Sequence, residues 1–417
     1  MKKYKLGELI EVSRGASLKG DFYAASGKYI RLTCGNFDYR NNSFKENTSK
    51  DNLFYIGEFK TEFLLEKGDL ITPLTEQAIG LLGSTAWIPE SGKYIQSQDI
   101  AKITCKEELL DKKFAYYLIS SNMVKQQLSA AAQQTKIRHT SPDKIKDCTV
   151  WLPSLEKQKQ IGQLLFDLDR KIELNRAINH NLEAMAKQLY DYWFVQFDFP
   201  DENGKPYKSS GGAMVYNENL KRNIPEGWND GIFADIANIT MGQSPDGSSY
   251  NETGEGEIFY QGSTDFGIRF PSVRMYTTSP TRYAKQGDIL MSVRAPVGAV
   301  NIANSDCCIG RGLSAINSMV GSITYIYYVV HYLKVRFDNL NTAGTTFGSI
   351  TKDELFNLPV VVPSNDMIER FEVICKPIFN KQMEIGFEIE SLDKQRNELL
   401  PLLMNGQASL NYDLSNG

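Results

Sequence analysis

A pattern typical of a long coiled-coil helix occurs twice along this chain. In the first copy, the helix-facing positions alternate four and three residues apart from residue 161 to residue 193, after Trp151-Leu152-Pro153. The same spacing recurs 210 residues later (363 − 153), after Val361-Val362-Pro363. A period near 3.5 residues keeps one stripe of a helix against a partner helix. We therefore predict two long helices that serve as each other's partner.

The two predicted stripes differ in polarity. Asn175 and Asn179 interrupt the first stripe, where they either lie buried and disfavour wrong registers or face water. Two amphipathic helices that each lie on their own domain are the alternative arrangement, but the sustained spacing in both copies favours a pair. The first stripe is Ile161, Leu165, Leu168, Ile172, Asn175, Asn179, Leu182, Ala186, Leu189 and Trp193, and the second is Phe371, Cys375, Ile378, Gln382, Ile385, Ile389, Leu392, Arg396, Leu399 and Leu403.

The repeat extends beyond the helices into the segments that precede them. These segments show short alternating runs punctuated by Gly, Asn and Pro, as β-rich domains do. Each also contains one predicted local helix, from Lys113 to about Leu128 and from Thr324 to about Phe337. A fixed order of weak matches indicates that a whole β-rich domain and its helix were duplicated. Residues 6–15 resemble 233–242, residues 67–71 resemble 286–290, residues 97–103 resemble 310–316, and residues 135–141 resemble 345–351.

The predicted organisation is therefore an α+β chain with two β-rich domains and two long helices. Residues 198–224 are polar and rich in Gly and Pro, as expected of a connection between the halves. The predicted parts are domain one at 1–153, the first helix at 154–197, the linker at 198–224, domain two at 225–362, the second helix at 363–405 and a tail at 406–417.

Composition narrows the functional classes. The chain has 41% hydrophobic and 23% charged residues, a net charge of −4, and no apolar run near the ~20 residues of a membrane span. The first residues are basic but lead into no signal-peptide core, and the six cysteines form no Cys-x-x-Cys pair, so we expect a cytoplasmic protein with reduced thiols. The acidic balance argues against a large non-specific nucleic-acid binder. Any DNA binding must rest on local patches or on partners.

Signatures of catalysis are missing from the sequence. There is no phosphate-binding Gly-rich loop, and no Asn/Asp-Pro-Pro-aromatic element of the kind expected in an enzyme that methylates adenine. The only histidines, His139, His180 and His331, lie far apart in the sequence, which disfavours a metal site or a catalytic triad. We therefore expect a non-catalytic recognition or scaffolding protein that needs no cofactor.

The first helical region resembles the central conserved region of type I restriction-modification specificity (S) subunits. The resemblance rests on residues 168–179 (LDRKIELNRAIN) and 193–197 (WFVQF), and the duplicated plan covers about residues 1 to 405. The second helix departs from the motif, because Glu384-Ile385-Gly386 replaces Leu174-Asn175-Arg176.

This resemblance implies two target-recognition domains separated by an antiparallel helix pair with approximate two-fold symmetry. Each domain would recognise one half of a bipartite, asymmetric site on double-stranded DNA, and the helices would set the spacing. The implied partners are two copies of a DNA adenine methyltransferase (M) subunit and a restriction and translocase (R) subunit, with no membrane. The alternative function is a non-catalytic protein-interaction scaffold with a coiled-coil spacer.

Candidate DNA-binding residues are polar or basic side chains in predicted loops, because arginine suits guanine and amides suit adenine. Alternatives stay open for each: an ordinary solvated loop, a turn glutamine, or an arginine that pairs with an acid such as Asp288. Asn36 and Gln77 rank lower. The candidates are Thr135, Lys136, Arg138 and His139 in the first domain, and Gln261, Ser263, Arg294, Arg311, Thr345, Thr346 and Ser349 in the second.

Overall fold

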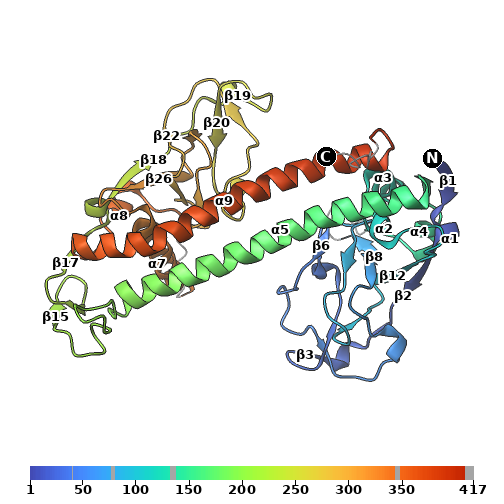
Figure 1. Ribbon diagram of the computed structural model, residues 1–417, viewed down its shortest axis with the longest axis horizontal. Coiled ribbons are helices and arrows are strands. Elements are labelled where there is room, and N and C mark those ends of the chain that lie inside the picture. The colour runs from blue at the N-terminus through green and yellow to red at the C-terminus, as the bar shows by residue number, and fades with distance from the viewer. Residues whose placement is uncertain (40, 77–79, 132–137, 343–347, 409–417) are drawn as a thin grey trace, which may run out of the picture. The chain divides into compact units, whose positions relative to one another are not determined.

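The computed structural model describes residues 1–39, 41–76, 80–131, 138–342 and 348–408 (Figure 1). The chain divides into two compact units. The first unit comprises residues 1–173 and the segment from Glu390, and the second comprises residues 174–389. Both boundaries fall inside long helices, so each unit holds one part of α5 (Leu155–Tyr190) and one part of α9 (Asn365–Met404).

Two four-stranded sheets form the β-rich part of the first unit. One has the strand order β10-β8-β12-β2 and is antiparallel, whereas the other has the order β11-β4-β7-β3, with β11 parallel to β4. The strands are β1 Lys2–Lys5, β2 Ile10–Arg14, β3 Tyr23–Ala24, β4 Tyr29–Arg31, β5 Phe37–Asp38, β6 Ser43–Phe44, β7 Phe54–Tyr55, β8 Leu70–Pro73, β9 Thr75–Glu76, β10 Ala86–Trp87, β11 Tyr94–Ile95, β12 Ile100–Cys105, β13 Arg138–His139 and β14 Thr149–Leu152. The short helices are α1 Leu6–Leu9, α2 Lys112–Ile119, α3 Asn122–Ala131 and α4 Pro142–Lys146.

The second unit repeats this plan. Its two larger sheets have the orders β18-β26-β23-β24 and β19-β21-β20-β25-β22, with β20 parallel to β25. The strands are β15 Met214–Asn217, β16 Arg222–Pro225, β17 Asn229–Ile232, β18 Ala237–Met241, β19 Tyr250–Asn251, β20 Glu257–Tyr260, β21 Tyr276–Thr277, β22 Tyr283–Ala284, β23 Ile289–Ser292, β24 Val300–Ile302, β25 Cys307–Ile309, β26 Leu313–Ser318 and β27 Pro359–Val362. The helices are α6 Phe233–Ile236, α7 Ile323–Thr342 and α8 Lys352–Phe356.

Corresponding elements follow the same order in both units, which confirms the predicted α+β class and its internal repeat. The central strands β8, β12 and β2 of the first unit match β23, β26 and β18 of the second, and the parallel pair β4–β11 matches β20–β25. Each unit also pairs its first strand with the strand before its long helix, β1 with β14 and β17 with β27. This pairing starts each long helix beside the first strand of its β-rich part.

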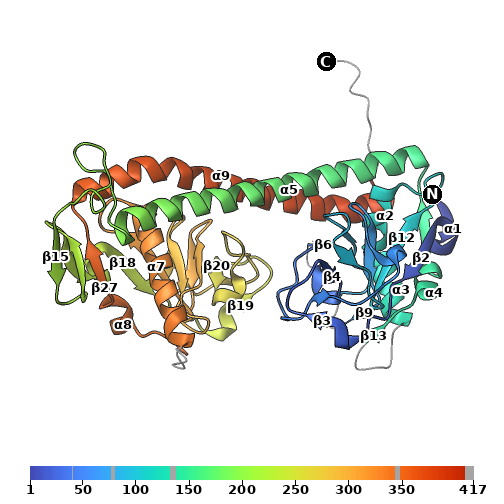
Figure 2. The same cartoon turned by 90° about the horizontal axis from the view of Figure 1, so that it is seen from below.

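Segments of the two long helices lie side by side and antiparallel within each unit (Figure 1). In the second unit, Asn175 of α5 bonds to Glu388 of α9, and Asn179 bonds further back along α9, to Gln382. The residue numbers on α9 therefore decrease as those on α5 increase, as expected of two antiparallel helices. Figure 2 shows the strands of the second unit on one side of its helix segments.

The predicted stripe positions are buried or half-buried between these helices. Each unit has its own core: Leu165 and Leu403 share one in the first, and Ala186 and Phe371 share one in the second. Ile161, Leu165, Ile172, Asn175, Asn179, Ile385 and Leu392 are buried, and Leu168, Leu182, Leu189, Ile378, Ile389 and Leu399 are half-buried.

Three local features differ from the sequence-based expectations. The predicted linker contains a β-hairpin, because β15 pairs with β16. The single helix expected from Lys113 to about Leu128 is interrupted at Ser120 and Ser121, whose hydroxyls bond to carbonyl oxygens of the preceding turn. The first long helix changes to a wider π-turn over Asp191–Val195, just before the connection between the halves.

Candidate nucleic-acid interface

Four loop segments of the second unit meet at one edge of its sheets. The parallel strands β20 and β25 and the strand β23 all end at this edge, and β26 begins there because it runs antiparallel to β23. Backbone hydrogen bonds join the segments: Gly310 to Tyr260 at 2.8 Å, Val293 to Gly312 at 2.9 Å, and Ile350 to Val293 at 2.9 Å. The sheet topology therefore gathers residues that are up to ninety positions apart (350 − 260).

Each of these segments carries a residue that the sequence analysis selected. Gln261 follows β20, Arg311 follows β25 and Arg294 follows β23, and all three side chains are exposed. Ser349 is also exposed and forms an isolated β-bridge with Arg294, while Ser263 is half-buried in the turn after Gln261. The structure thus brings together all five candidates of the second unit that it describes.

Arg294 does not pair with Asp288, the acid considered as its structural partner. Asp288 accepts hydrogen bonds from the side chain of Asn317 at 2.6 Å and from the backbone N–H of Lys285 at 2.8 Å. Burial raises the pKa of the Asp288 carboxyl, and these two hydrogen bonds oppose the shift. Among the described residues, the Arg294 guanidinium forms no ion pair and no side-chain hydrogen bond. It is therefore available to a ligand.

Arg274 lies beside the same edge and was not among the sequence-based candidates. Its Nε donates to Asp265 Oδ1 at 2.9 Å, and Asp265 Oδ2 accepts the backbone N–H of Gln261 at 2.9 Å. Asp265 is buried, whereas the Arg274 side chain is 58% exposed. Arg274 therefore compensates the negative charge of the buried Asp265 carboxylate. No sequence signal links the two residues, because their contact depends on how the loop folds.

A comparable edge exists in the first unit. Strand β9 pairs with β13, so Thr75 lies opposite His139 and Glu76 opposite Arg138 (Figure 2). His139 is exposed, and its Nδ1 is 3.4 Å from Thr75 Oγ1.

Several candidates cannot be placed at either edge. Thr135, Lys136, Thr345, Thr346 and the lower-ranked Gln77 lie outside the described residues, as does the side chain of Arg138. Asn36, also ranked lower, is buried, and its amide donates to the carbonyl oxygen of Lys45.

Two equivalent glycines allow close approach of the backbone at both edges. A Cβ on Gly15 would lie 2.3 Å from the carbonyl oxygen of Gln96, and one on Gly242 would lie 2.1 Å from that of Gly310. Each glycine directly follows the corresponding strand, β2 or β18. In the first unit, the adjacent exposed residue is Gln98, the counterpart of Arg311, which the sequence analysis did not select. Glycine is therefore required beside both candidate segments.

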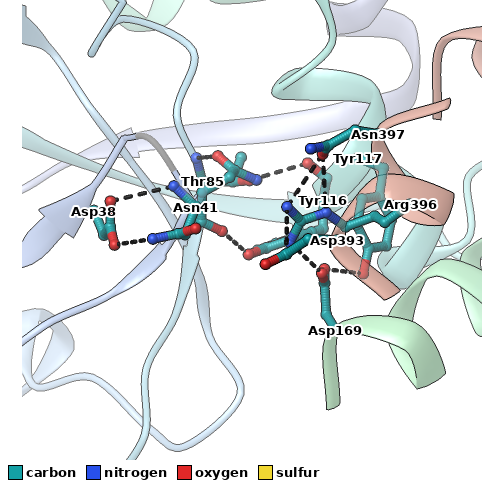
Figure 3. A network of polar contacts seen from close by, with 10 residues as sticks. Asp38, Asn41, Thr85, Tyr116, Tyr117, Asp169, Asp393, Arg396 and Asn397 are labelled. Carbon is teal, nitrogen blue, oxygen red and sulfur yellow. Dashed lines mark hydrogen bonds and ion pairs between the residues drawn. The ribbon is translucent and has the colours of Figure 1, made fainter. Parts of the chain in front are cut away.

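A polar network anchors the helix pair in the first unit (Figure 3). Asp169 of α5 accepts hydrogen bonds from Tyr117 Oη at 2.6 Å and from Arg396 Nη1 of α9 at 2.9 Å. Arg396 also forms an ion pair with Asp393 at 3.0 Å. Burial and the neighbouring Asp169 raise the pKa of Tyr117, so the hydroxyl stays protonated and donates. The network ties α2, α5 and α9 together.

The same network reaches the β-rich part of the first unit through the neighbouring residue of α2. Tyr116 Oη donates to the carbonyl oxygen of Asn42, and the Asn42 side chain bonds to Thr85 Oγ1 at 2.8 Å (Figure 3). Polar contacts of α2 therefore reach the β-rich part of the first unit at Thr85, directly before β10.

Polar positions of the stripe in the second unit are partnered in a similar way. Gln382 Nε2 donates to Glu183 Oε2 at 2.9 Å, and Arg269 Nη1 lies 3.4 Å from the same oxygen. The Arg269 guanidinium also lies over the ring of Phe379, 4.8 Å from its centroid. Because the partners come from the facing helix and an adjacent loop, the polar residues make the pairing specific to this register.

Metal and membrane features are limited. Within the described ranges, no three His, Cys, Asp or Glu side chains are grouped as a metal ion requires. In the same part of the chain, every helix is too short or too polar to span a bilayer.

Comparisons with known proteins agree with this architecture. The family model for the type I restriction modification DNA specificity domain matches residues 1–184 and 225–399. A protein of Methanocaldococcus jannaschii, assigned as the type I restriction enzyme MjaX specificity subunit, is 32% identical over 382 residues, which cover 85% of this chain and 83% of that protein. The HindI specificity subunit of Haemophilus influenzae is 23% identical and covers 97% of this chain and 99% of its own length.

A solved structure shows the same fold. The crystal structure of a type I restriction-modification system S subunit from M. genitalium has a TM-score of 0.61 with this chain, at 16% sequence identity. The matched region covers 98% of this chain and 96% of the chain from M. genitalium. On the family model and the MjaX relative, this chain belongs to the family of the type I restriction modification DNA specificity domain.

Proposed function

We propose that this chain is the DNA specificity subunit of a type I restriction-modification complex, and that the loop edge of each unit recognises one half of a bipartite DNA site. The observation that carries the proposal is the convergence of Gln261, Arg294 and Arg311 on one exposed edge of a chain from this family. Loops on a rigid sheet are common places for recognition residues. The two edges carry different residues, so the two half-sites are expected to differ.

The chemistry of the edge suits base recognition. The guanidinium of Arg294 or Arg311 can donate two hydrogen bonds to the O6 and N7 of guanine, and the amide of Gln261 matches the N6 and N7 of adenine. Ser349 and Ser263 can hydrogen-bond to either bases or phosphates. In this proposal His139 contributes to the edge of the first unit.

The net charge of −4 supports a division of labour between subunits. Phosphate contacts supply a large share of the affinity of DNA-binding proteins. In this chain the 50 acidic residues outnumber the 46 lysines and arginines. We therefore expect two copies of an adenine methyltransferase subunit to supply contacts to the DNA phosphates and to carry out methylation. A restriction and translocation subunit is expected to join this complex. This chain contributes specificity and no catalytic step.

The test uses the purified complex of this chain with its methyltransferase subunit. Methylated adenines are mapped on a genomic DNA library for the wild type, for Arg294→Ala and for the control Lys208→Ala, which changes an exposed cation outside the edge. The proposal expects methylation at one bipartite motif, relaxed at one half-site by Arg294→Ala and unchanged in the control. Methylation without sequence preference, or without need of this chain, would contradict it.

Salt dependence separates this function from that of a protein-interaction scaffold. DNA recognition requires binding of the complex to fall steeply as salt rises, because counterions are released. A scaffold that binds only proteins needs no such slope.

A further inference from the structure

A cavity of about 800 Å³ lies in the first unit, between α5, α2 and the strand β10. Its volume falls within the range of roughly 300–1,000 Å³ that is typical of small-molecule sites. None of the residues selected for DNA recognition lines it. Its walls combine aromatic rings with lysines and include Phe44, Lys67, Trp87, Lys112, Lys113, Tyr116, Lys159 and Phe166.

The aromatic part of the cavity forms a stacking platform. Trp87 stacks on Tyr116 with the ring planes 8° apart and the centroids at 5.1 Å. Tyr116 is buried, but Trp87 remains half-buried at the edge of its sheet. The Phe166 ring of α5 lines the same cavity. A flat aromatic ligand can therefore stack on a rigid tryptophan that its neighbour already holds in place.

Lysines line the same cavity. In the described part of the chain, Lys67, Lys112 and Lys159 form no salt bridge, and Lys112 Nζ lies 5.8 Å from the centroid of the Trp87 ring. Two carboxylates, Asp111 and Glu173, also line the cavity, but four lysines line it and outnumber them. Asp111 caps α2, where it accepts the backbone N–H of Phe114 at 2.9 Å. The charge balance of the cavity is therefore positive and suits an anion.

We propose that this cavity binds a nucleoside phosphate, with the base stacked on Trp87 and the phosphates among Lys67, Lys112 and Lys159. Base stacking on aromatic side chains together with cationic contacts to phosphate is the usual chemistry by which proteins hold unpaired nucleotides. Two sources share this chemistry, a free nucleotide and an unpaired nucleotide of a nucleic-acid strand.

The proposed site is separate from the recognition edge of the same unit. Trp87 pairs with Leu70 at the start of β8, whereas Thr75 follows the opposite end of that strand. Binding here would add a nucleotide response to the specificity function. Failure of this proposal would therefore leave the methylation motif and its dependence on Arg294 unchanged.

Calorimetric titration of the full chain tests the proposal with two probes, ATP and a short single-stranded oligodeoxyadenylate. The variants Lys112→Glu and Lys159→Glu place a negative charge in the cavity, and Lys157→Glu makes the same charge change on α5 outside it. We expect each cavity variant to weaken binding about tenfold, with little effect of the control. Thermal melting checks that each variant is folded.

Each outcome decides the proposal. Tight binding of ATP that the cavity variants weaken supports a free nucleotide, and preference for the oligonucleotide supports a strand. Trp87→Phe should retain part of the affinity, because it keeps an aromatic face. Absence of binding by both probes, or binding that the cavity variants leave unchanged, overturns the proposal. So does a result in which these variants weaken only the association with the methyltransferase subunit, since the cavity would then be a protein-docking surface.

Discussion

Replacement of Arg396 by methionine should destabilise the first unit strongly. The Arg396 side chain is only 12% exposed and that of Asp169 is 22% exposed, so their ion pair at 2.9 Å is largely shielded from water. The variant removes the cation that faces both Asp169 and Asp393 and leaves two carboxylates partly buried. Breaking one partner of a buried pair costs about 3–5 kcal/mol, and the partial exposure of both acids places this case near the lower limit.

Urea denaturation followed by circular dichroism measures the effect. With an m-value of about 2 kcal/mol/M, a loss of ~3 kcal/mol shifts the midpoint by roughly 1.5 M. The double variant Arg396→Met with Asp169→Asn should recover more than ~1 kcal/mol, because the second change removes an uncompensated charge. Lys394→Met, an exposed neighbour on α9, should stay within about 0.5 kcal/mol of the wild type. A loss below ~1 kcal/mol for Arg396→Met would refute the claim that the ion pair between Arg396 and Asp169 stabilises the first unit (Figure 3). Strict additivity in the double variant would refute it as well.

Three further predictions follow from the same structure. Arg294→Ala should weaken binding of the complex to its target by about 1–3 kcal/mol, measured by fluorescence anisotropy, and an equal loss on unrelated DNA would show that the residue contacts only phosphate. Leu165→Ala should cost about 2–5 kcal/mol in chemical denaturation because Leu165 is fully buried, whereas Leu174→Ala, at a side chain 53% exposed, should cost below ~0.5 kcal/mol; similar losses would contradict the assignment of the stripe. Burial lowers the pKa of His331, so the unfolded chain binds more protons than the folded chain at pH values between the folded-state pKa and about 6.5. Stability should therefore fall as the pH drops from about 6.5 toward the folded-state pKa and level off below it. His331→Gln should flatten this part of the stability–pH curve, and an unchanged curve would exclude His331 as its source.

Sequence periodicity was sufficient to predict the two long helices and their buried stripes. Apolar spacing of four and three residues has a simple physical consequence, because it places one stripe against a partner irrespective of the rest of the fold. The order of weak matches between the halves similarly predicted the repeat of β-rich parts, since matching strands occupy matching places in both sheets.

Contacts between distant loops could not be predicted from the sequence. Candidates such as Arg294 and Ser349 were selected by residue type alone, and their meeting depends on the pairing of the segment after β23 with the segment before α8. No local sequence pattern indicates that Arg274 pairs with Asp265. Pairing of Arg294 with Asp288 was one open alternative, and the structure instead pairs Asp288 with Asn317.

The amino-acid sequence by itself determined the class of the chain, its duplicated plan and the helix surfaces that must be buried, because these depend on local periodicity and on the hydrophobic effect. Only the tertiary structure decided which polar residues share a partner. Asn179 and Gln382 form a hydrogen bond because the helices pair in one register. The segments that carry Gln261 and Arg311 lie side by side because β20 is parallel to β25. Strand order and helix register are set by the sum of many long-range contacts, and so they are not encoded in any single segment.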